Sequence, residues 1–116
     1  MKTTILVKTS FEALHSWPSC NIPEVYFLGN PHHHVFDVVA EIEVQRDDRE
    51  VEFFVLKSQV DEQIDIILNL HGYKEGMYFY TPMSCEMMCE KLLEYIPALV
   101  SVEVWEDGKR GARVIR

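Results

Sequence analysis

The sequence predicts an α+β domain in which an antiparallel four-stranded sheet carries two helices on one face. Three stretches alternate apolar and polar residues with the two-residue period of a strand, namely 2–15, 33–45 and 98–106. Two others, 58–71 and 84–96, repeat their apolar residues at helical spacing. With one more short strand at the end, the order is strand, strand, helix, helix, strand, strand. The 116 residues suffice for a single domain, 1–116, with one modest core.

In the first half of the chain, the strand at 2–15 is followed by a long loop at 16–31 that contains three prolines. A loop of this length in so small a domain is more often functional than idle. The second strand, 33–45, ends at the polar turn 46–49. The apolar run at 51–56 is short enough to be either a third strand or the lead-in to the first helix.

In the second half, capping and helix-terminating residues mark the ends of the two helices. Gly72 supplies the stop of the first helix, Ser84 caps the second, and Pro97 ends it. The stretch 73–82 is aromatic and irregular, and an Asp-Gly turn at 107–108 leads into the last strand, 112–115. The expected buried stripes are Val60, Ile64, Ile67, Leu68 and His71 in the first helix, and Cys85, Met88, Cys89, Leu92, Tyr95 and Ile96 in the second.

Composition restricts the classes of partner. The formal net charge is −8, and the only locally basic segment is 109–116, which can steer a small anion or simply keep a strand edge soluble. Nucleic-acid binding is therefore not expected. No apolar stretch is long enough for a membrane span or a signal core. The three cysteines are an odd number, which favours free thiols and a cytoplasmic protein.

Three histidines are expected to meet at one end of one sheet face. Side chains alternate along a strand, so His15 ends the apolar row of the first strand, while His32 and His34 begin that of the second. If the two strands form an antiparallel hairpin, the three imidazoles become neighbours and offer a zinc site with an open fourth position. The alternative is a solvated loop at 32–34 and a lone hydrogen-bonded His15.

Other polar residues can carry chemistry near this site. Glu106 ends an apolar row, and its carboxylate can accept two parallel hydrogen bonds from an amino-pyrimidine edge or can simply face water. Cys20 lies in the long loop. Beside a zinc ion its thiol could be activated to a thiolate and act as acid or base; the alternative is a loop cysteine with no such role. Cys85 and Cys89 share a helix face and can ligate a metal or fill the core, and the neighbouring Met88 favours the core.

Four stretches occur in the order and spacing of a known family. Residues 11–15 read Phe-Glu-Ala-Leu-His, similar to Phe-x-Ala-x-His, and residues 32–34 read His-His-His where the family has His-Gly-His. Residues 51–57 contain the acidic-Phe-x-x-Leu-Lys pattern, and 102–106 read Val-Glu-Val-Trp-Glu, similar to a final Val-x-Val-x-Glu. The chain thereby resembles the 6-pyruvoyltetrahydropterin and 6-carboxytetrahydropterin synthases, members of the tunnelling fold, as a divergent relative.

The resemblance implies a zinc ion bound by His15, His32 and His34, and a pterin ring anchored by Glu106. It also implies that subunits join their sheets into a barrel, as trimers or stacked hexamers, with sites between subunits. The family's substrate is 7,8-dihydroneopterin triphosphate. Its lyase reactions eliminate triphosphate or cleave the side chain, giving precursors of biopterin or queuosine, while a cysteine and an Asp–His pair move protons.

The expected proton carriers are displaced. Four residues before the first histidine of the His-x-His motif, where the family has its cysteine, this chain has Leu28, so Cys20 can serve only if the loop folds back. The Asp–His pair falls on Leu68 and Asn69, and His71 is merely nearby. Cys20 and His71 are the catalytic candidates. We expect a zinc enzyme that acts on a dihydropterin triphosphate or a close relative. The alternative is an inactive protein that binds a pterin, purine or nucleotide. A metal with a purely structural role is a third possibility.

Overall fold

A long antiparallel hairpin organises the structure, a computed structural model that describes residues 1–74, 77–79 and 83–116. Its strands are β1 (Thr3–His15) and β2 (His32–Val44), which pair over their full length from Thr3 opposite Val44 to His15 opposite His32. Because both strands alternate apolar and polar residues in phase, this register places one apolar row beside the other on a single face. The predicted hairpin is confirmed.

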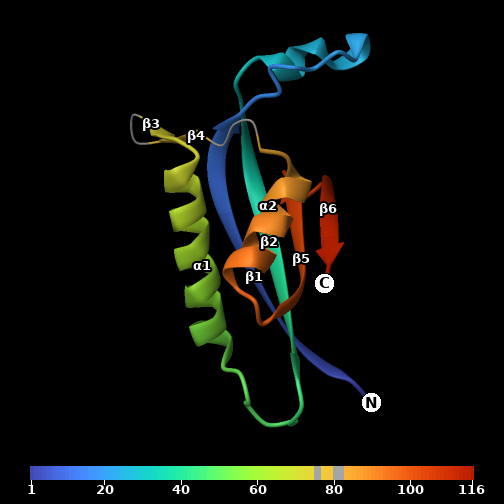
Figure 1. Ribbon diagram of the computed structural model, residues 1–116, viewed down its shortest axis with the longest axis vertical. Coiled ribbons are helices and arrows are strands. Elements are labelled where there is room, and N and C mark those ends of the chain that lie inside the picture. Colours follow the sequence, from blue (N-terminus) through green and yellow to red (C-terminus); the bar gives the residue numbers. More distant parts are fainter. Residues whose placement is uncertain (75–76, 80–82) are drawn as a thin grey trace.

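The remaining strands extend the hairpin on both sides. β5 (Leu99–Glu106) pairs antiparallel with β2, and β6 (Arg110–Ile115) pairs antiparallel with β5. The predicted antiparallel four-stranded sheet is thus confirmed. Within the stretch expected to be irregular, β3 (Tyr73–Lys74) and β4 (Met77–Phe79) add two short strands beside β1, and β4 runs parallel to it. The sheet order is β3-β4-β1-β2-β5-β6 (Figure 1).

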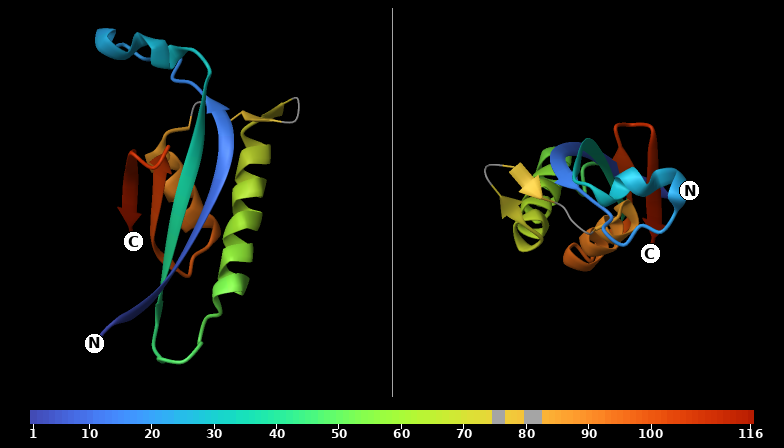
Figure 2. Two further views of the ribbon diagram at one scale, coloured as in Figure 1. Left: turned by 180° about the vertical axis from the view of Figure 1, so that it is seen from behind. Right: turned by 90° about the horizontal axis from the view of Figure 1, so that it is seen from above.

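Two helices cover the same face of the sheet (Figure 2). α1 (Phe53–Leu70) packs on β1, and α2 (Cys85–Tyr95) packs on β5 and β6. Ser84 caps α2 as predicted, since its hydroxyl accepts a hydrogen bond from the Met87 N–H at 3.2 Å. Gly72, at φ +118°, follows the end of α1 in a conformation that suits glycine.

The expected start of α1 at residue 58 is wrong by five residues. The Glu52 side chain accepts a hydrogen bond from the Val55 N–H at 2.9 Å and caps the helix there. The run at 51–56 is therefore the lead-in to the helix and not a third strand. The apolar stripe does not reveal this first turn, because Phe53, Phe54 and Val55 are exposed and lie off the buried face.

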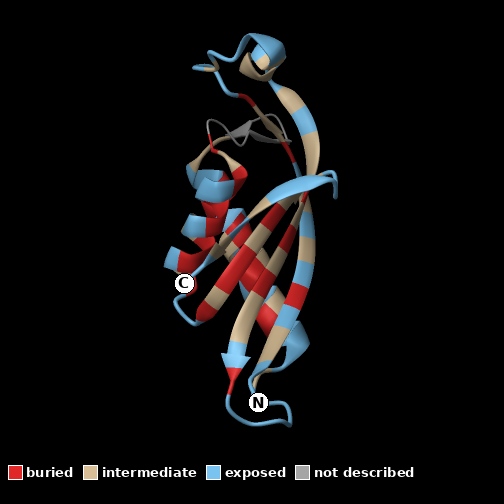
Figure 3. Ribbon diagram, turned by 90° about the vertical axis from the view of Figure 1, so that its right-hand side faces the viewer, coloured by how far each residue is buried: buried red, intermediate tan, exposed pale blue. Residues whose placement is uncertain are grey.

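The core lies between the sheet and the helices, where the buried residues gather in Figure 3. Cys85 and Cys89 belong to it, as the core alternative predicted, and burial raises their pKa values to about 12 and about 11. Strict alternation from Val102 and Val104 would also bury Val100, but a bulge opposite Glu41 and Ile42 leaves Val100 half-buried and turns Leu99 into the core instead. His71, expected in the α1 stripe, is half-buried at the helix C-cap.

The loop at 16–31 forms an arm that extends past the end of the hairpin (Figure 1). It contains the 3-10 helix η1 (Pro23–Gly29), and the Trp17 N–H donates to the Leu28 carbonyl at 2.6 Å, closing the base of the arm. Among the described residues, no helix has the length and apolar character needed to cross a membrane.

Candidate metal centre

Three histidine side chains converge where the β1–β2 hairpin meets the arm. His15 lies opposite His32 in the register, and His34 shares their face because it is two residues further along β2. A ring nitrogen from each of the three lies within 4.8 Å of the other two. The ring centroids are 4.4 Å apart for His15 and His32, and 5.0 Å apart for His32 and His34. This juxtaposition matches the convergence expected from strand alternation.

Hydrogen bonds determine which nitrogen of each of two rings is free. The Nδ1 of His32 lies 2.7 Å from the Asn30 carbonyl oxygen, and the Nδ1 of His34 lies 2.6 Å from the Asp107 carboxylate. Both partners only accept, so each Nδ1 carries the proton and donates it. In the neutral rings, the Nε2 atoms of His32 and His34 are therefore lone-pair donors, as metal ligands must be.

The Nε2 of His32 provides the test of fit for a metal. It is buried and has no hydrogen-bond partner among the residues that the structure describes. An unsatisfied buried acceptor is unfavourable, and a bound cation satisfies it. Three imidazole nitrogens form a donor set that suits zinc with one position left for a ligand. The residues at this site thus fit a zinc ion.

The environment of His15 favours the neutral imidazole. Its pKa is lowered below the ordinary value, first by burial and then by the neighbouring His32, with a smaller contribution from His34. Glu106 and the Met83 backbone act in the opposite direction. A neutral imidazole is the form that binds a metal ion, so this shift favours metal binding at moderately acidic pH.

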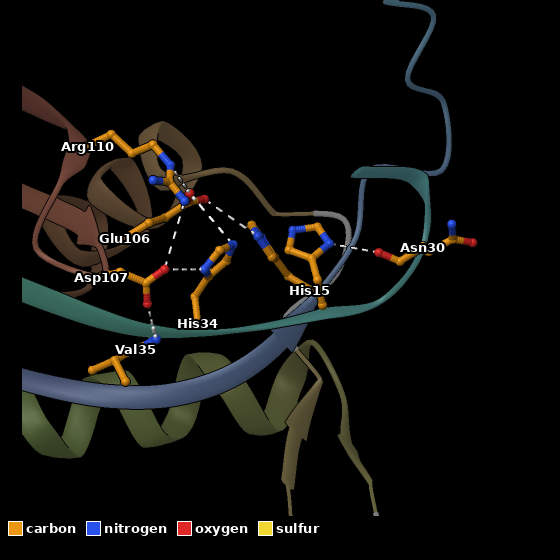
Figure 4. Close-up of polar contacts among 8 residues, drawn as sticks. His15, Asn30, His34, Val35, Glu106, Asp107 and Arg110 are labelled. Atoms are coloured by element: carbon orange, nitrogen blue, oxygen red, sulfur yellow. Dashed lines mark hydrogen bonds and ion pairs between the residues drawn. The ribbon is translucent and has the colours of Figure 1, made fainter. Parts of the chain in front are cut away.

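Glu106 points into the histidine cluster from the end of β5 (Figure 4). Its carboxylate oxygens lie 3.5 Å from His15 Nε2 and 3.8 Å from His34 Nε2. Its side chain is only 20% exposed, so it does not simply face water. Arg110, at the start of β6, holds the carboxylate from the other side at 3.2 Å. The sequence alone predicts no contact between Arg110 and this site.

Asp107, for which the alternating pattern predicts only a place in a turn, also contacts the cluster. Its carboxylate accepts hydrogen bonds from the Val35 N–H at 3.0 Å and from His34 Nδ1 at 2.6 Å. These two bonds, that of Val35 first, lower the pKa of the Asp107 carboxyl. The only sequence signal is its place directly after Glu106, beside a strand end that already carries a polar residue.

The cluster forms the polar end of a cavity of about 1030 Å³. Glu106 and Arg110 line this end together with the three histidines. The arm and the segment around the start of α2 also line the cavity. They contribute the polar Ser16, Ser84 and Glu86 and a larger apolar set: Trp17, Val25, Phe27, Leu28, Met83 and Met87. A cavity that combines a polar cluster with a largely apolar lining suits a small ligand with a flat ring and polar edges.

The two catalytic candidates lie elsewhere in the chain. The Cys20 thiol contacts the Val25 carbonyl of its own loop at 3.5 Å, and His71 caps α1 through its backbone N–H. Neither is among the residues lining the cavity, whereas Leu28, at the position of the family cysteine, is. Within the described residues of one chain, the structure thus brings Glu106 to the three histidines but not Cys20 or His71.

No family model and no curated protein sequence matches the chain. The structure is similar to that of 6-pyruvoyl tetrahydropterin synthase from Caenorhabditis elegans, with a TM-score of 0.64 and 16% identity, over 100% of this chain and 96% of that chain. It is also similar to an uncharacterized protein from Wolinella succinogenes, with a TM-score of 0.69 and 17% identity, over 100% of this chain and 99% of that chain. The chain therefore has the fold of 6-pyruvoyl tetrahydropterin synthase, the tunnelling fold that its motifs predicted.

Proposed function

We propose that this protein is a zinc-dependent, 6-pyruvoyltetrahydropterin synthase-like protein that acts on 7,8-dihydroneopterin triphosphate or a close relative. The observation that carries this proposal is the convergence of His15, His32 and His34 at the polar end of a cavity, with Glu106 directed at the same point. The likeness to a structure described as 6-pyruvoyl tetrahydropterin synthase supports the choice of substrate class.

The three histidines hold the metal, and the residues around them orient the ligand. When bound, zinc supplies a Lewis acid that polarises a hydroxyl or carbonyl oxygen of the ligand's side chain. Glu106 accepts hydrogen bonds from the N–H groups at one edge of a pterin ring. Arg110, 3.2 Å from the Glu106 carboxylate, forms an ion pair with that group and restrains its position.

Proton transfer is proposed for Cys20 and His71, the two catalytic candidates named from the sequence. The Cys20 thiol contacts its own loop at Val25, so this role requires the arm to fold further over the cavity. One observation favours a second function: Leu28, an apolar residue, lines the cavity where the family has its cysteine. On that account the chain binds a pterin, purine or nucleotide without turnover.

Homo-oligomers, trimers or hexamers with sites between subunits, are part of the proposal. The sheet ends in β6 on one side, and an unpaired strand edge can pair with another copy. The arm exposes Tyr26 and Phe27, which are 59% and 64% exposed in a single chain. Sedimentation is expected to show trimers or hexamers, and a monomer at micromolar concentration would contradict this part of the proposal.

Turnover distinguishes the two functions. Zinc-loaded protein is incubated with 7,8-dihydroneopterin triphosphate, and the absorbance of the product is followed over time. The synthase-like proposal predicts product formation that scales with protein concentration and disappears in a His32→Ala variant. Absence of product at high protein concentration, with zinc bound and the pterin retained in equilibrium dialysis, would refute the enzyme and support the binder.

A further inference from the structure

The Asp107 side chain connects the β5–β6 turn to His34 (Figure 4). One carboxylate oxygen accepts from His34 Nδ1 at 2.6 Å, and the other accepts from the Val35 N–H at 3.0 Å. The Asp107 N–H in turn donates to the Val35 carbonyl at 2.7 Å. Two hydrogen bonds thus hold the carboxylate against the start of β2, and the backbone bond holds the turn in the same place.

The turn itself does not require an aspartate. Asp107 has φ +53° and Gly108 has φ +67°, so both lie in the left-handed region. Asparagine and glycine occupy the first such position at least as readily as aspartate. What aspartate adds is a second acceptor oxygen and a negative charge, and both are used on His34 and Val35. A side chain held in this backbone region with both carboxylate oxygens engaged indicates a role beyond turn formation.

We propose that Asp107 is a positioning residue of the metal centre. By accepting the proton of His34 Nδ1, it holds the imidazole in the tautomer whose Nε2 lone pair faces His15 and His32, and it fixes the orientation of the ring. This proposal rests on the proposed zinc site. His32 receives the equivalent support from a neutral carbonyl, that of Asn30. The Asp107 carboxylate accepts a stronger, charge-assisted hydrogen bond from His34 than a neutral carbonyl would.

Asp107→Asn is the sharpest test, because asparagine keeps the size of the side chain and tolerates the left-handed backbone. Its amide has one accepting oxygen in place of two, so either the His34 Nδ1–H or the Val35 N–H loses its acceptor. Zinc affinity, measured by competition with a chromophoric chelator, is expected to fall roughly 10- to 100-fold. Asp48→Asn is the matched control, since Asp48 is exposed in a distant turn and the charge change is identical.

A second measurement needs no metal. In the zinc-free wild-type protein, imidazole ¹⁵N shifts are expected to show His34 in the Nδ1–H tautomer, and Asp107→Asn is expected to populate the Nε2–H form. A purely structural role for Asp107 would not move this tautomer. Asp107→Gly, which suits the turn and lacks any carboxylate, is expected to reproduce both effects and guards against an Asn-specific folding defect.

The outcomes separate this proposal from that of the zinc site. Suppose that wild-type protein binds zinc, that the zinc affinity of Asp107→Asn is within twofold of the wild-type value, and that the variant keeps the wild-type His34 tautomer. The positioning role is then overturned, and the zinc site stands. If wild-type protein binds no zinc, the zinc site fails as the function of this cluster. In that case the His34 tautomer in the two variants still decides whether Asp107 sets the state of the ring.

Discussion

The Phe36 ring packs against two histidines of the cluster, and its truncation is expected to destabilise the core and to weaken metal binding at the site. The side chain is fully buried, and its ring centroid lies 5.2 Å from that of His15 and 5.8 Å from that of His34. It also stacks on Phe11 of the neighbouring strand at 5.1 Å. Two of the three proposed metal ligands, His15 and His34, therefore lie against this ring.

The magnitude follows from complete burial. Truncating a fully buried Phe to Ala typically costs about 3–5 kcal/mol, and an aromatic pair such as Phe11–Phe36 adds about 0.5–1.5 kcal/mol beyond its buried area. Phe36→Ala is thus expected to lower the free energy of unfolding by about 5 kcal/mol, which corresponds to a fall in Tm of roughly 20 °C in a chain of this size. Phe36→Leu, which fills much of the space, is expected to cost about 1–2 kcal/mol.

Urea unfolding followed by circular dichroism measures these values in the zinc-free protein. Leu6→Ala is the control, because Leu6 is 54% exposed on the opposite face of β1 and is expected to cost less than about 1 kcal/mol. A zinc titration of Phe36→Leu is expected to show weaker binding than wild type. A cost below about 1 kcal/mol for Phe36→Ala, with an unchanged m value, would refute the packing argument.

Three further predictions concern the site itself. Glu106→Gln is expected to weaken binding of a pterin ligand roughly 10- to 100-fold in equilibrium dialysis, because a hydrogen bond to a charged group is worth about 1.5–3 kcal/mol. Zinc is expected to stay bound in this variant. An unchanged pterin affinity would contradict the anchoring role. The zinc-free protein is expected to lose stability as the pH falls from 7 towards 5. In the unfolded chain His15 takes up its proton near its ordinary pKa of about 6.5, whereas in the folded protein it does so only at lower pH, so protonation favours the unfolded state. His15→Gln is expected to reduce this slope of unfolding free energy against pH, and an equal slope in the variant would contradict the assignment. Cys20→Ala is expected to abolish turnover if the loop thiol carries a proton, and full activity in that variant would refute this role.

The histidine cluster was predictable from sequence because two simple rules determine it. Alternation along each strand fixes which residues share a face, and a full-length antiparallel hairpin brings the end of β1 beside the start of β2. His15 and His32 are therefore register partners without any need for side-chain detail. The same rule places Glu106 on this face, opposite Phe36 in the β2–β5 register.

Features that depend on local geometry could not be derived in this way. The bulge in β5 displaces Val100 from the core, and nothing in an alternating run of apolar residues reveals it. The early start of α1 depends on one hydrogen bond that the Glu52 side chain accepts from the Val55 N–H. The contacts of Asp107 and Arg110 depend on how closely the β5–β6 turn folds against the start of β2, which periodicity does not specify.

Zinc stoichiometry in the wild type and in two neighbouring variants tests the central claim most directly. His32→Ala removes a proposed ligand, whereas His33→Ala removes the adjacent imidazole, which is exposed and contacts Glu12 at 3.8 Å instead of the cluster. Elemental analysis is expected to find about one zinc per chain in the wild type and in His33→Ala, and far less in His32→Ala. Metal well below one per chain in the wild type, or equal content in the two variants, would contradict a zinc centre built from these three histidines.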